Sequence, residues 1–93
     1  MKYMVTWTAR PGTYKEAVKR FLKTGAPPPK GLKTIGRWHS AGSSCGFHLV
    51  EGTDAALTEL AVEWADLLEL KIAPVVEDDV AAAAASKLYG KKK

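Results

Sequence analysis

Residues 34–51, TIGRWHSAGSSCGFHLVE, decide the fold because they predict a β-hairpin that holds both histidines and the only cysteine of the chain. Two runs of strand-forming residues, 34–41 and 44–51, flank the pair Gly42-Ser43, which is typical of a tight hairpin turn. Closing the hairpin at this pair predicts four cross-strand pairs: Arg37 with His48, His39 with Gly46, Ile35 with Val50, and Trp38 with Phe47.

The side chains of this hairpin alternate between two faces. One face carries a guanidinium, two imidazoles and two aliphatic groups: Arg37, His39, His48, Ile35 and Val50. The other face is apolar: Trp38, Phe47, Leu49 and Cys45. We predict that the apolar face packs against the helices, with Trp38 in the monomer core and Cys45 as a packed, inert thiol. The basic face then points away from the helices.

The rest of the chain predicts two more strands and three helices. In order, they are a strand over 2–9, a helix from Thr13 to Gly25, a helix opening at 52–54, a strand over 68–76, and an alanine-rich helix ending near Tyr89. Thr13 and Glu16 have the spacing of a capping box. Pro74 cannot donate a ladder hydrogen bond, so the last strand should lie at a sheet edge. Trp64 falls on the apolar stripe of the second helix and should be core.

This order, β-α-β-β-α-β with a terminal helix, predicts an α+β, ferredoxin-like chain. Right-handed crossovers give an antiparallel four-stranded sheet with both crossover helices on one face. The other face is left bare, and a second copy packed sheet to sheet is the simplest cover, so we expect a homodimer. We predict one domain over residues 1–90, followed by a basic tail, 91–93.

Composition bounds the function. The chain has 93 residues, of which 46% are hydrophobic and 26% charged, as in an ordinary globular domain. No apolar run approaches the roughly 20 residues that cross a bilayer, so we expect no membrane association. The lone cysteine fits a reducing compartment, and we expect a cytoplasmic protein. The net charge of +4 is scattered apart from the tail, which argues against nucleic-acid binding.

Several short motifs together resemble the DUF3303 family. They are MVTW at 4–7, Arg10-Pro11-Gly12, GRWH at 36–39, Gly46-Phe47, Val50-Glu51 and Pro74-Val75-Val76. The resemblance covers residue 1 to about residue 85. It implies membership of the dimeric α/β-barrel proteins, in which two ferredoxin-like chains join their bare sheet faces around a barrel. That wider group includes cofactor-free monooxygenases, isomerases, haem-handling enzymes and proteins without an established activity, so the resemblance implies no single reaction.

The basic face of the hairpin is the candidate site. If it points into a dimer barrel, it predicts an apolar pocket with a few convergent polar groups, the usual composition of a small-molecule site. His39 is the candidate general base and Arg37 the anchor for an anion. The candidate ligand-binding residues are His48, Trp7, Thr6, Ile35 and Val50. The alternative is that the three basic residues face solvent or an interface.

We expect no metal and no cofactor. Two histidines lack the usual third protein ligand, and the charge of Arg37 opposes a cation. The sequence therefore predicts a small dimeric α/β-barrel protein that binds a small organic molecule. Two readings stay open: a cofactor-independent monooxygenase or isomerase, and a non-enzymatic binding or structural homodimer.

Overall fold

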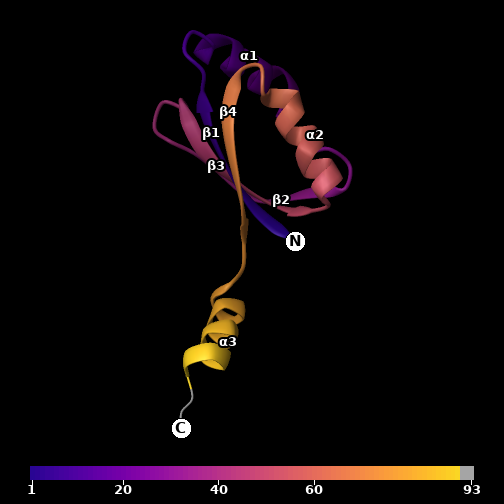
Figure 1. The fold of residues 1–93 in the computed structure, drawn as a ribbon. Coiled ribbons are helices and arrows are strands. Elements are labelled where there is room, and N and C mark those ends of the chain that lie inside the picture. The colour runs from indigo at the N-terminus through magenta and orange to yellow at the C-terminus, as the bar shows by residue number, and fades with distance from the viewer. Residues whose placement is uncertain (91–93) are drawn as a thin grey trace.

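The computed structural model describes residues 1–90, and the predicted basic tail, 91–93, lies outside the described residues. The elements are β1 (Lys2–Ala9), α1 (Tyr14–Thr24), β2 (Leu32–His39), β3 (Cys45–Gly52), α2 (Asp54–Trp64), β4 (Leu68–Val75) and α3 (Asp78–Tyr89). They form a four-stranded antiparallel sheet of order β2-β3-β1-β4, with α1 and α2 on one side of it (Figure 1). The predicted ferredoxin-like fold with a C-terminal helix is confirmed.

The termini of the two crossover helices follow from local sequence, with one exception. Gly25 ends α1 in the left-handed conformation, at φ 73°, and its N–H donates to Phe21 O at 2.7 Å. Thr53 caps α2 through its side chain, which accepts from Ala56 N at 3.2 Å. The predicted capping box at Thr13 is wrong, because its hydroxyl makes no cap hydrogen bond.

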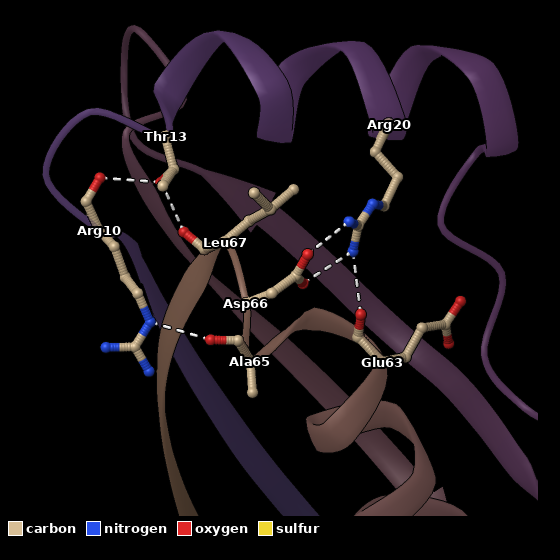
Figure 2. Close-up of polar contacts among 7 residues, drawn as sticks. All are labelled: Arg10, Thr13, Arg20, Glu63, Ala65, Asp66 and Leu67. Carbon is tan, nitrogen blue, oxygen red and sulfur yellow. Dashed lines mark hydrogen bonds and ion pairs between the residues drawn. The ribbon is translucent and has the colours of Figure 1, made fainter.

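The Thr13 hydroxyl instead ties the start of α1 to the loop that precedes β4. Its Oγ1 lies 2.8 Å from Arg10 O and 2.7 Å from Leu67 O, as Figure 2 shows. Arg10 Nε donates to Ala65 O in the same loop at 2.9 Å. The hydroxyl accepts no hydrogen bond from the first turn of α1, so a tertiary contact takes the place of the predicted local one.

A second link joins the middle of α1 to the end of α2. Arg20 donates to both carboxylate oxygens of Asp66, at 3.0 and 2.7 Å, and to Glu63 O at 2.9 Å (Figure 2). Its guanidinium carbon also lies 5.2 Å from the centre of a Trp64 ring. The ion pair is exposed and adds little stability by itself, but the planar guanidinium fixes how the two helices lie over the sheet.

The register of the hairpin was predicted only in part. Arg37 faces His48, Trp38 faces Phe47 and His39 faces Gly46, as predicted. The pairing of Ile35 with Val50 is wrong, because a bulge at Ile35 shifts the register and leaves Thr34 opposite Val50. The connection is also longer than a two-residue turn: the strands end at His39 and resume at Cys45.

The predicted facing of the hairpin is wrong. Trp38 and Phe47 lie on the sheet face away from the helices and are 54% and 49% exposed. The helix side of the hairpin instead carries Val50, which is fully buried, and His48. The side is decided by β1, whose buried Val5 pairs with His48 in the ladder, rather than by the hydrophobicity of the hairpin alone.

The buried core lies between the sheet and α2. It contains Val5, Leu32, Val50, Ala56, Leu57, Leu60, Trp64 and Leu68, with Ala26 from the proline-rich connection. The predicted burial of Trp64 is confirmed. Strand β4 lies at the sheet edge with Pro74 in it, as predicted.

Helix α3 extends away from the sheet beyond the end of β4 (Figure 1), and all its side chains are exposed. An ion pair between Lys2 and Glu77 lies just before it. Because α3 points away from the sheet, the face of the sheet opposite α1 and α2 is left uncovered. Within residues 1–90, no helix is both long and apolar enough to span a membrane.

Candidate functional site

A cavity of about 210 Å³ lies between the sheet and the two crossover helices. Its walls are mostly apolar and come from both strands and helices: Val5, Trp7, Phe21, Leu60, Trp64 and Leu70. Four polar side chains from the hairpin complete the lining: Arg37, His39, Ser43 and His48. An apolar cavity with a few polar groups on one side has the composition of a small-molecule site.

Arg37 is held in place by the end of α1. Its Nη1 donates to Ala26 O at 2.7 Å and its Nη2 to Gly25 O at 3.1 Å. The guanidinium carbon lies 5.5 Å from the centre of the Phe21 ring. Because the C-terminus of a helix carries partial negative charge, a guanidinium is favoured there. The contacts place a fixed positive charge at the cavity.

His48 is the only buried polar or charged residue among residues 1–90, with 4% of its surface exposed. Burial, and secondarily the nearby charge of Arg37, lowers its pKa from 6.5 to about 4. Its ring is therefore neutral at pH 7. Thr34 Oγ1 lies 2.8 Å from His48 Nε2, which satisfies one of the two ring nitrogens.

His39 is more accessible and lies between two aromatic rings. Its ring centre is 5.2 Å from that of Trp7 and 5.2 Å from that of Phe21, both in edge-to-face geometry. These contacts join β2 to β1 and α1 around one imidazole. His39 remains exposed, so its ring nitrogens are open to a bound molecule or to water.

Trp7 reaches the cavity because its neighbour on β3 is a glycine. A Cβ on Gly46 would meet the ring of Trp7 and the carbonyl oxygen of Trp38. On the opposite face of the sheet, Gly36 has the same relation to the ring of Trp38. Each tryptophan therefore lies over a strand position without a side chain.

Four of the seven predicted site residues lie together. Arg37, His39, His48 and Trp7 line the cavity. The three others, Thr6, Ile35 and Val50, do not. Thr6 alternates with Val5 and Trp7 and so faces away from the helices, Ile35 is the bulged residue and is 42% exposed, and Val50 is fully buried in the core.

The location of the candidate site also differs from the prediction. The basic residues were expected to point away from the helices into a barrel between two chains, but they face α1 and α2 of their own chain. Phe21, Leu60 and Trp64 were not predicted as lining residues. The sequence signal for these residues was the apolar stripe of each helix. This stripe packs toward the sheet and so forms the second wall of any cavity on that side.

The described residues hold no group of three or more histidine, cysteine or carboxylate side chains arranged to bind a metal ion. What the arrangement offers is an apolar wall, one fixed guanidinium, one buried neutral imidazole and one accessible imidazole. These groups can bind an uncharged ring and can donate hydrogen bonds to an acceptor at its edge.

Comparison with known protein families matches residues 1–89 to DUF3303, a domain of unknown function. The chain belongs to the DUF3303 family. Neither the comparison with curated proteins nor that with solved structures gives a match. The family assignment carries no reaction with it, so a function for this DUF3303 chain has to come from the cavity and the sheet.

Proposed function

We propose that this DUF3303 protein binds a small organic molecule in the cavity between its sheet and its crossover helices. The observation that carries the proposal is the lining, which is apolar on the helix side and has Arg37, His39 and His48 on the hairpin side. A cavity of ~150 Å³ is enough for benzene, so a volume of about 210 Å³ fits a single ring with one small substituent.

The test is the binding of three one-ring probes, benzyl alcohol, benzamide and benzoate. Heteronuclear NMR of the isotope-labelled protein detects the binding. Saturable shifts at Trp7, Phe21 and His48 are expected. Ala17, a lining residue of α1, offers a variant that fills the cavity, and Ala17→Leu should abolish the shifts. The matched control is Ala55→Leu on the exposed side of α2. No saturable shift with any probe, in a folded protein, would refute the proposal.

Catalysis is the second candidate, and the position of His39 favours it because this imidazole is accessible and lines the same cavity as Arg37. A cofactor-independent isomerase or monooxygenase would begin by moving a proton from the bound molecule to such a base. Exchange of the methyl hydrogens of acetophenone in D2O reports this step. The wild-type chain should accelerate the exchange and His39→Gln should not. Equal exchange rates for the two proteins would rule out this catalytic role and leave ligand binding as the only proposed function of the cavity.

We also propose that two copies of the chain join through the open face of the sheet, as in the dimeric α/β-barrel proteins. Trp38, Phe47 and Ile35 expose large apolar surfaces on or beside this face. Large exposed apolar patches mark interaction surfaces. The patch is bordered by both signs of charge, for example Lys33 opposite Glu51, so a second copy meets no uniform repulsion.

Sedimentation at micromolar concentration tests this pairing. We expect a species of twice the chain mass and a shift to the monomer in Trp38→Asp. The matched control is Val62→Asp, which places the same charge on an exposed apolar residue of α2, away from the sheet. A wild-type chain that sediments as a 10.0 kDa monomer would contradict the proposal.

A further inference from the structure

The charge of the cavity is unbalanced. Among the residues that line it, Arg37 is the one with a permanent charge, and no carboxylate contributes to the lining. Arg20, which links α1 to the end of α2, is paired with Asp66 outside the cavity. Within residues 1–90, Arg37 makes no ion pair, and its hydrogen bonds go to two backbone carbonyls. An isolated cation beside an apolar wall favours a negative ligand.

The guanidinium has hydrogen-bonding capacity left for such a ligand. It carries five N–H donors, and the carbonyls of Gly25 and Ala26 take two of them. Because these carbonyls directly follow α1, the fork is held at a fixed position and loses little entropy when it binds an anion. The partial negative charge at the end of α1 offsets part of the cationic charge without using the remaining donors.

The imidazole of His48 adds a neutral donor on the same wall. Its Nε2 lies 2.8 Å from Thr34 Oγ1; in the tautomer in which the hydroxyl donates to Nε2, the ring proton is on Nδ1. Nδ1 has no hydrogen-bond partner among residues 1–90. Since this buried ring stays neutral, it can donate to an anion without adding a second positive charge.

From these observations we infer that the ligand is a small aromatic or cyclic monocarboxylate, with its ring against Trp7 and Phe21 and its carboxylate on Arg37. This inference rests on the proposed function. One fixed cation matches one negative charge, whereas a dianionic phosphate would leave a charge unpaired in an apolar cavity. The volume remaining beyond a benzene-sized space is about 60 Å³, which leaves room for one small substituent such as a carboxyl group.

The experiment compares benzoate with benzamide, its neutral isostere, by calorimetric or NMR titration of the full chain at pH 7. A charge-assisted pair with Arg37 predicts that benzoate binds at least about tenfold more tightly. Arg37→Gln should abolish this preference while benzamide binding is kept. Lys33→Gln is the matched control, because it removes one positive charge from the open face of the same strand, and it should keep the preference.

Because Arg37 also ties β2 to α1, a second measurement uses the wild-type chain. The side-chain ¹⁵N resonances of Arg37 should shift with benzoate and not with benzamide. Equal affinity for the two probes, a preference that survives in Arg37→Gln, or unshifted Arg37 resonances would overturn the monocarboxylate inference and leave small-molecule binding intact. Failure of benzoate, benzamide and benzyl alcohol alike to bind would refute the proposed function itself.

Discussion

Acidification should destabilise the protein through one buried imidazole, His48. In the unfolded chain this ring binds a proton below about pH 6.5, but in the folded chain burial and the charge of Arg37 keep it neutral down to about pH 4. Between these values the unfolded state binds more protons than the folded state, so the free energy of unfolding falls as the pH is lowered. Below about pH 4 both states are protonated and the loss from this residue stops.

The structure sets the size of the effect. Lowering a pKa from 6.5 to about 4 corresponds to a total loss of about 3 kcal/mol, of which about 2 kcal/mol falls between pH 7 and pH 5. The exposed ion pairs act at lower pH. Arg20 and Lys2 lower the pKa of Asp66 and Glu77, and their contribution is lost only below the ordinary carboxylate values of 3.8 and 4.5. The loss of free energy of unfolding between pH 5 and pH 6.5 is therefore attributed to His48.

Urea unfolding at pH 7, 6 and 5, followed by circular dichroism, measures this loss. His48→Gln should flatten the dependence on pH in this window, even if it lowers stability at pH 7. His39→Gln changes the accessible imidazole of the same cavity and should keep the wild-type slope. A wild-type free energy of unfolding that is constant between pH 7 and pH 5, or an unchanged slope in His48→Gln, would refute the reasoning.

Three further predictions concern the fold. Gly46→Ala puts a methyl group against the ring of Trp7 and should cost about 1–3 kcal/mol by overpacking, measured by urea unfolding. Thr53→Ala removes the cap that accepts from Ala56 N and should cost about 1 kcal/mol in the same assay; an unchanged midpoint would show that the cap adds nothing. Deleting residues 78–90, which are exposed throughout, should leave the unfolding midpoint within error of wild type, and a clear fall would mean that α3 packs on something in solution.

The topology was predictable because its signals are local. Gly25 can adopt the left-handed backbone that ends a helix, Thr53 caps a helix, and Pro74 favours an edge strand of the sheet. Each signal is contained within a few residues. Where a side chain had a tertiary alternative, local reasoning failed. Thr13 has the spacing of a capping box, yet its hydroxyl bonds to Leu67 O, far along the chain.

The candidate site was predictable as a set but not in its location. Period-two alternation placed Arg37, His39 and His48 on one face, and they share that face in the structure. Which side of the sheet this face lies on depends on the neighbouring strand β1. Its buried Val5 pairs with His48, so the two side chains lie on the helix side. The bulge at Ile35 has no clear signal in the sequence, and it removes this residue from the set.

The three tryptophans, two of which lie over glycines, give the molecule optical reporters in different places. Trp7 lies at the cavity opposite Gly46, Trp38 lies on the open sheet face over Gly36, and Trp64 is buried in α2. Ligand entry should alter the emission of Trp7 and Trp64, which both line the cavity, whereas chain pairing should alter that of Trp38. Variants that keep one tryptophan each would thus separate ligand entry from chain pairing, two processes that an unmodified chain reports as one sum.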